Sequence, residues 1–410
     1  MTMRPILALG CALALLIPFA SRGDDRPTLL VPARSDSAPP ESEPAPLLGP
    51  GRPNPRDSTM QSAEQMALQQ YRLGVTMEAS NRVGPGIAAF RNAVRLDPTM
   101  RDANYRLGKL LLQAGRLSDA LACFAAEVAH DPKNLDAARE LGLTLARLGD
   151  RGRSIAQLER LTRKAPRDGR NWHALGFAYR AADRPLDAEA ALRKAVQLPP
   201  DDAEEHRDLG ALLAERKRDR EARDEYRRAL ALSPRDPTTW LNLANLERRA
   251  GRRDSALVCY ARAEGGDSTF SLAYRGQIAL LREQERLVDA GEVYRRWLRN
   301  RPEEHGARLE AVRLFDTLHQ PEIALEIARD GVRDAGDTGQ PHLIYGMVLA
   351  DQGRSREALR ELRRAERMFH EHPADARRAA QVIERLRASA PDSLREFFRN
   401  DSLSHARRAP

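Results

Sequence analysis

The sequence is short of cysteine, of aromatic residues and of lysine. Of its 410 residues only three are cysteines, and 5% are aromatic. So few cysteines exclude a small fold that is held together by disulfides. The two cysteines that follow the N-terminal segment, Cys123 and Cys259, lie far apart in the chain, and we expect neither a disulfide nor a redox pair.

The patterns that carry catalysis are also missing. The nine histidines show no metal-ligand spacing, no glycine-rich loop follows a strand pattern, and no arrangement of Ser, His and Asp stands out. Alternating patterns that predict β-strands do not occur. We therefore expect no enzyme activity, no metal and no cofactor.

Charge is plentiful but of mixed sign. The chain has 67 basic residues, only five of them lysine, and 59 acidic residues, which leaves a net charge of +8. Basic and acidic residues alternate along the predicted helices, which is typical of a solvated, salt-bridged helix surface. The sequence therefore predicts no nucleic-acid partner.

The one long apolar run lies at the N-terminus. Arg4 followed by the run from Ile6 to Ala20 predicts that residues 1–23 are an export signal or, if uncleaved, a membrane anchor. Cys11 leaves a lipoprotein site open. Residues 24–57 hold nine prolines and predict a disordered linker. The rest of the chain is expected in the periplasm or at the cell envelope.

The remaining sequence follows a period of 34 residues. If Gly169 is position 1 of a unit, the pattern recurs without insertion or deletion, and nine units begin at residues 67, 101, 135, 169, 203, 237, 271, 305 and 339. Position 8 is small in seven units and position 20 in all nine, while position 24 mostly holds a larger side chain. Small residues at positions 8 and 20 predict two closely packed antiparallel helices in each unit.

The fourth unit shows the pattern most completely, with Trp172, Leu175, Gly176, Tyr179, Ala188, Leu192, Ala195 and Pro200. This pattern resembles the tetratricopeptide repeat. The resemblance implies an all-α, right-handed superhelical solenoid of about nine helix-turn-helix repeats over residues 58–372. Units seven and eight depart from it, because Gln277-Ile278 and Ala311-Val312 replace Leu-Gly.

Two further stretches carry expectations about the ends of elements. Gly265 and Gly266 predict an early end to the sixth second helix, which is either a hinge or an ordinary helix end. Residues 373–410 are predicted to form a capping helix and a tail, with the apolar residues Leu394, Phe397 and Phe398 either packed on the stack or docking a partner.

The resemblance also implies a concave groove lined by the first helices. Positions 5, 9 and 12 form one stripe of such a helix. On this stripe eight basic residues stand against Glu78 and Asp316: Lys109, Arg139, Arg180, Arg207, Arg248, Arg275, Arg282 and Arg313. Arginine can hold a carboxylate with two hydrogen bonds, so we expect an acidic peptide or an acidic protein surface as the partner. Scattered charge in an arginine-rich protein is the alternative.

Two asparagines complete the predicted binding residues. Asn242 and Asn245 resemble the groove asparagines with which some repeat proteins hold the backbone of a ligand. The carboxylate clamp of chaperone-binding members is not matched, because Leu241 and Gly276 occupy two of its positions.

These patterns together predict a non-catalytic scaffold that binds an extended segment of another protein in its groove. Two alternatives remain open. One is an assembly factor for an envelope complex that is tethered to the membrane by an uncleaved N-terminal segment. The other is a protein that binds an anionic polymer of the envelope, which would show a steep dependence on salt.

Overall fold

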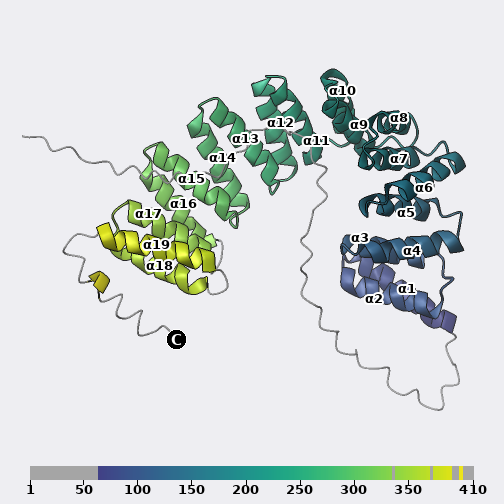
Figure 1. Ribbon diagram of the computed structural model, residues 1–410, viewed down its shortest axis with the longest axis horizontal. Helices are drawn as coiled ribbons and strands as arrows, with labels where there is room; N and C mark the ends of the chain where they lie inside the picture. The colour runs from purple at the N-terminus through teal and green to yellow at the C-terminus, as the bar shows by residue number, and fades with distance from the viewer. Residues whose placement is uncertain (1–62, 335–337, 370–372, 390–396, 400–410) are drawn as a thin grey trace, which may run out of the picture. The chain divides into compact units, whose positions relative to one another are not determined.

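The computed structural model describes residues 63–334, 338–369, 373–389 and 397–399. Within these residues the chain is all-helical, with nineteen labelled helices and no strand (Figure 1). The predicted export signal and linker lie outside the described residues. No described helix is both long and apolar enough to cross a membrane.

The helices alternate between a first and a second helix of each repeat. The first helices are α1 (Ala63–Ala79), α3 (Ala103–Gln113), α5 (Leu135–Arg147), α7 (Gly169–Ala181), α9 (Ala203–Glu215), α11 (Pro237–Arg249), α13 (Ser271–Glu283), α15 (His305–Thr317) and α17 (Gly339–Asp351). The second helices are α2 (Val83–Leu96), α4 (Leu117–His130), α6 (Arg151–Lys164), α8 (Pro185–Ala195), α10 (Asp219–Leu232), α12 (Arg253–Gly266), α14 (Leu287–Asn300), α16 (Pro321–Asp334) and α18 (Ser355–Met368). The last helix is α19 (Pro373–Ser389).

Polar caps fix where several first helices begin. Asp168, Asp202 and Asp236 precede α7, α9 and α11, and the carboxylate of each accepts hydrogen bonds from backbone N–H groups of the first turn. Such caps satisfy donors that have no partner inside the helix. They occupy position 34, immediately before the repeat start that the period predicts.

Glycine at position 8 explains how the two helices of a hairpin approach each other. A Cβ atom added to Gly142 would lie 2.5 Å from Leu158, and one added to Gly210 would lie 2.8 Å from Tyr226. Positions 8 and 20 also meet, because the Ser154 hydroxyl donates a hydrogen bond to the Gly142 carbonyl oxygen (2.7 Å). The predicted close packing at these positions is confirmed, with the large side chain at position 24 filling the space that the glycine leaves.

The hairpins stack in chain order. Each helix packs against the next, and first helices also contact the first helix of the following repeat, as α5 does α7 and α11 does α13. In the divergent repeats the larger Ile278 and Val312 are buried, at 5% and 4% exposure, so the stack continues through them. At the C-terminal end Ala379, Ile383 and Phe398 are buried in one cluster with Leu343 and Leu362.

The turn between the two helices is the same in every repeat. The residue at position 15 has a positive φ in all nine, and it is a glycine in four: Gly115, Gly149, Gly251 and Gly353. The others are Asn81, Asp183, Lys217, Glu285 and His319. Glycine adopts this left-handed conformation without strain, whereas residues with a Cβ do not.

The pair Gly265 and Gly266 does not end its helix early. Helix α12 runs to Gly266 and has 14 residues, as α10 and α14 do. The expectation of an early end is wrong. A Cβ on Gly266 would collide with the backbone carbonyl oxygen of Arg235, whereas a Cβ on Gly265 would meet no atom within 4 Å. Gly266 is therefore required by the close approach of the preceding turn.

Candidate functional site

The basic residues predicted for the groove lie on the first helices, and the structure divides them into two groups. In repeats two to six they are engaged by acidic residues. In repeats seven and eight they are exposed and have no ion pair among the described residues.

Position 5 arginines bind the caps of the next repeat. Arg139 donates to the Asp168 carboxylate (3.1 Å), and its other nitrogens reach Asn171 (2.9 Å) and Asp136 (2.6 Å). Arg207 lies 3.5 Å from Asp236 and donates to Glu204 (2.9 Å). Only 11% of the Arg139 side chain is exposed, so this guanidinium is part of the joint between repeats.

Position 12 arginines bind position 13 glutamates of the next repeat. Arg180 forms an ion pair with Glu215, and Arg248 lies 3.3 Å from Glu283. In both pairs the acid follows the arginine by 35 residues, one more than the repeat period. Such pairs across a stack bridge consecutive first helices.

These acidic partners were missed at the level of sequence, although a signal for them exists. A comparison of charges along one helix stripe overlooks the residues that stand 29 or 35 positions after each arginine in the chain. Asp168, Asp236, Glu215 and Glu283 all stand at those offsets.

Lys109, Asn242 and Asn245 are the other predicted binding residues. Lys109 is exposed, 3.9 Å from Glu78 and 5.7 Å from the centre of the Tyr105 ring. Asn245 is exposed and accepts a hydrogen bond from the Tyr260 hydroxyl (2.6 Å). Asn242 is half-buried and makes no side-chain hydrogen bond to the described residues. Gly276, at a clamp position, is held against the Tyr260 ring, which leaves no room there for an asparagine.

Arg275, Arg282 and Arg313 form the second group, which we call the free arginine face. All three are exposed. The Arg275 guanidinium lies 5.6 Å from the centre of the Trp297 ring. Arg282 lies beside the Tyr294 hydroxyl, which donates a hydrogen bond to Glu310 (2.7 Å). No acidic side chain forms an ion pair with any of the three in the part of the chain that the structure describes.

The position 12 to position 13 pairing breaks in the same repeats. Arg282 is followed 35 residues later by the neutral Thr317, and Asp316 is followed by Asp351. Burial raises the pKa of both aspartates, and the nearby Asp316 carboxylate raises that of Asp351 further. At positions 12 and 13 the last repeats thus lack the charge compensation of the earlier ones.

A buried polar cluster lies elsewhere, between repeats four and five. Glu205 is 2% exposed, and neither carboxylate oxygen has a hydrogen-bond partner in the described residues. Burial raises the pKa of this carboxyl to about 7. His173 bonds to Asp208 (2.9 Å), and His206 bonds to Glu225 (2.6 Å) and Asp201 (2.9 Å).

This cluster does not make a metal site. No group of three or more His, Cys, Asp or Glu side chains that could hold a metal ion occurs among the described residues. Cys123 and Cys259 are free, and burial raises the pKa of each thiol to about 11, which disfavours the reactive thiolate.

Among solved structures the chain is similar to several repeat proteins. TTC0263, a thermophilic TPR protein of Thermus thermophilus, is 27% identical, with a TM-score of 0.39 over 43% of this chain and 97% of that chain. The pilF protein of Pseudomonas aeruginosa is 20% identical, with a TM-score of 0.40 over 53% and 97%. YrrB, described as a TPR protein with an unusual peptide-binding site, is 20% identical, with a TM-score of 0.34 over 46% and 97%.

Family models give the assignment. A comparison with curated proteins found no match. Tetratricopeptide repeat models match residues 71–134, 105–169, 139–203 and 241–305, and a second such model matches 203–246. Together these matches run from residue 71 to residue 305, which is more than half of the chain. With the nine stacked hairpins, they show that the chain belongs to the tetratricopeptide repeat family.

Proposed function

We propose that this protein is a non-catalytic scaffold that binds an extended acidic peptide segment on its first helices, in repeats seven and eight. Tetratricopeptide repeat proteins generally mediate protein–protein interactions and are typically not catalysts. The proposal adds the kind of partner and the place where it binds.

The free arginine face is the observation that carries the proposal. Arg275, Arg282 and Arg313 are exposed on α13 and α15, without the acidic partners that engage Arg139, Arg180, Arg207 and Arg248. A guanidinium without a counter-charge can form charge-assisted hydrogen bonds with an incoming carboxylate. An arginine that already holds an aspartate must first give up that bond.

We further propose that the scaffold works outside the cytoplasm. The support is the apolar run before residue 23 and the proline-rich stretch after it. If the run is cleaved, the scaffold is free in the periplasm. If it is kept, it tethers an assembly factor to the membrane. N-terminal sequencing of the protein from its native envelope distinguishes the two, since only cleavage yields a chain that begins after Ala20 or Gly23.

Charge reversal on the face tests the binding proposal. The variant R275E/R282E/R313E should bind an acidic peptide at least tenfold more weakly, because a hydrogen bond between charged groups contributes about 1.5–3 kcal/mol. Fluorescence anisotropy with unstructured peptides that are matched in length and differ only in Asp and Glu content measures this affinity.

A matched control exists on the second helices of the same part of the chain. Arg262, Arg299 and Arg329 are exposed on α12, α14 and α16. The variant R262E/R299E/R329E makes the same change in net charge away from the face and should retain peptide binding. Equal loss in both variants would show that only total charge matters, and unchanged binding in the first would refute the proposal.

A further inference from the structure

The second helices carry a charge pattern that is independent of the free arginine face. Six residues are basic at repeat position 25, six at position 26 and five at position 29. Only Glu159 and Asp330 are acidic at these positions. We call these three positions, taken over all nine repeats, the basic ridge. Cations in the last turn of a helix are favoured by the helix dipole, which applies to position 29.

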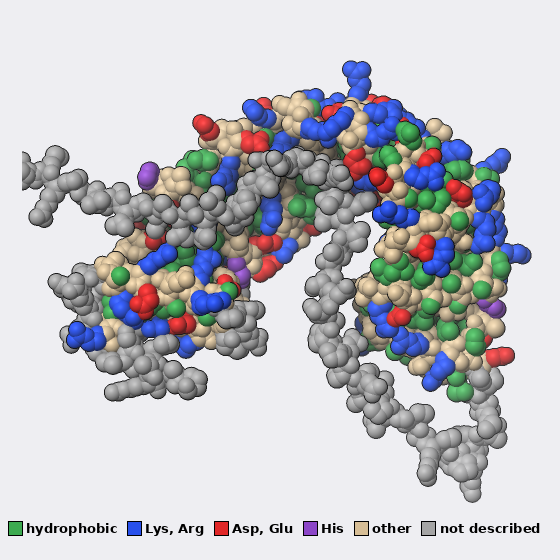
Figure 2. Space-filling model, in the orientation of Figure 1, with side chains coloured by type: hydrophobic (Ala, Val, Ile, Leu, Met, Phe, Trp, Pro, Cys, Tyr) green, Lys and Arg blue, Asp and Glu red, His purple; other side chains and the backbone are tan. Residues whose placement is uncertain are grey.

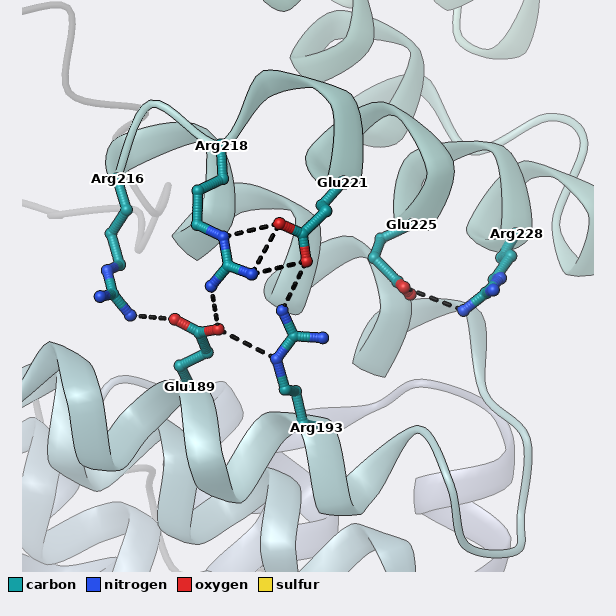
Figure 3. A network of polar contacts seen from close by, with 7 residues as sticks. All are labelled: Glu189, Arg193, Arg216, Arg218, Glu221, Glu225 and Arg228. Atoms are coloured by element: carbon teal, nitrogen blue, oxygen red, sulfur yellow. Dashed lines mark hydrogen bonds and ion pairs between the residues drawn. The ribbon is translucent and has the colours of Figure 1, made fainter.

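Stacking brings these helix ends together. Arg193 of α8 donates to Glu221 of α10 (2.7 Å), and the same glutamate binds Arg218, as Figure 3 shows. Arg296 of α14 reaches Glu264 of α12 (3.0 Å), and Arg295 reaches Glu326 of α16 (3.2 Å). Consecutive second helices therefore lie within reach of one arginine side chain.

Part of the ridge has no counter-charge. In repeats six to nine Arg262, Arg299, Arg329 and Arg367 are exposed and form no ion pair with the described residues. Arg193 and Arg296 hold closer acidic partners, whereas Arg227 pairs only loosely, since it is 68% exposed and 3.9 Å from Asp224. Exposed pairs of this kind contribute little and are screened by salt, so an incoming anion can displace them. Figure 2 shows basic side chains projecting from the surface near α6 and α10.

The position of acidic residues beside the ridge favours a thin partner over a flat one. Acidic residues such as Asp187, Glu221, Asp289 and Glu357 stand at position 19, seven residues before position 26. Seven residues of one helix span about 10 Å, but a ridge arginine can reach the acidic row of the next helix, as Arg193 reaches Glu221 (2.7 Å). A flat anionic membrane would face the acidic row as well, whereas a thin chain can follow the ridge arginines that have no acidic partner.

The composition of the ridge selects the chemistry of the partner. No position 25, 26 or 29 holds an aromatic residue. The ridge therefore offers no platform on which nucleic-acid bases could stack. Recognition by charge alone gains most from the polymer with the most closely spaced charges, because bound counterions are released when it binds.

We propose that the basic ridge is a binding surface for a linear polymer of phosphate groups. The arginine forks hold phosphate oxygens, and one or more basic residues in every repeat except the second meet successive parts of the same chain. The surface lies on the second helices, so the polymer and a peptide on the first helices do not compete for the same side chains.

Inorganic polyphosphate is the probe that tests this surface. The full chain should bind it with an affinity that falls steeply with salt. In R262E/R299E/R329E the affinity should fall at least tenfold, and the slope of log K against log salt should decrease in magnitude by about 2 to 3, because three phosphate contacts are lost. The neutral variant R262Q/R299Q/R329Q gives the same readout without added negative charge, and circular dichroism confirms folding.

The free-arginine-face variant R275E/R282E/R313E is the reciprocal control, since it should keep polyphosphate binding while losing the acidic peptide. An equal loss of polyphosphate in this variant overturns the ridge as the site, as does unchanged binding in both ridge variants. Equal or tighter binding of single-stranded DNA of matched charge, or of anionic lipid vesicles, overturns the phosphate polymer as the partner.

Discussion

Arginine occupies the same repeat positions throughout the first helices, yet it does different things in different repeats. Arg139 and Arg180 hold an acid of the next repeat, whereas Arg275 and Arg282 have none. For Arg282 the difference is one residue, the neutral Thr317 that stands 35 positions later. For Arg275 an acid does stand 29 positions later, but Glu304 is engaged by Arg301 and the Ser271 hydroxyl instead. A stripe of arginines on one helix therefore predicts a binding face only after its partners in the next repeat have been paired off.

Glu205 is a buried ionisable residue at the joint between repeats four and five. Its carboxyl is buried without a hydrogen-bond partner among the described residues, and its pKa is raised to about 7 from 4.5. The folded protein thus holds a proton that the unfolded chain releases. Its contribution to stability is present below about pH 4.5 and is lost as the pH rises through about 7.

The variant E205Q should flatten this part of the pH profile. At pH 8 we expect it to be more stable than the parent by about 1–2 kcal/mol, because a neutral amide costs less to bury than a carboxylate. Urea unfolding of both proteins between pH 5 and pH 8 measures the difference. The exposed E64Q on α1 is the control, and a difference that does not grow with pH would contradict the assignment.

At the scale of the helix, glycines in adjacent positions have opposite roles. Gly265 and Gly266 both end α12, but only Gly266 faces the backbone of the preceding turn at Arg235. The sequence shows two equivalent glycines. Only the packed structure shows which one the fold requires.

Substitution by alanine separates the two positions. G265A should stabilise the protein by about 0.5–1 kcal/mol, since alanine loses less backbone entropy in a helix. G266A should destabilise it by about 1–3 kcal/mol, because the added methyl group overpacks the contact with the Arg235 carbonyl. Thermal unfolding measures both, and a shift of the same sign in both variants would refute this account.

Most of the helices could be predicted from the sequence, because the same pattern of small and apolar residues recurs in each repeat. Position 8 is small in seven units and the turn falls at position 15 in all nine, so a weak signal in one repeat is read from the others. The extent of α12 could not be predicted. Glycine favours a helix end by propensity, and the close approach to Arg235 that leaves no room for a side chain at Gly266 comes from another repeat.

The whole stack is held together by neighbours only, and its C-terminal end depends on α19. Ile383 and Ala379 of this helix are buried against α17 and α18. In such an array an end without a cover exposes the apolar face of the last repeat, while distant repeats keep their own neighbours.

The variant I383D should therefore unfold locally. Burial of an unpaired carboxylate in this apolar cluster is expected to free repeats eight and nine and leave repeats one to four unchanged. Hydrogen exchange read by mass spectrometry checks this region by region. The exposed E384A on the same helix is the control, and uniform loss of protection along the chain would contradict neighbour-limited stability.

The candidate site was predicted only in outline from the sequence. Repeat positions gave the correct helices for every basic residue of the face. The split between engaged and free arginines depended on contacts across repeats, and the basic ridge depended on the stacking of consecutive second helices. Neither could be read from charge counts along one helix.

The left-handed turns between the helices differ in backbone strain from repeat to repeat. Four turns use glycine, which adopts this conformation freely, whereas five turns hold a residue with a Cβ atom in it: Asn81, Asp183, Lys217, Glu285 and His319. We expect these five turns to open more readily than the glycine turns under a pulling force or on heating, and those of repeats seven and eight border the free arginine face.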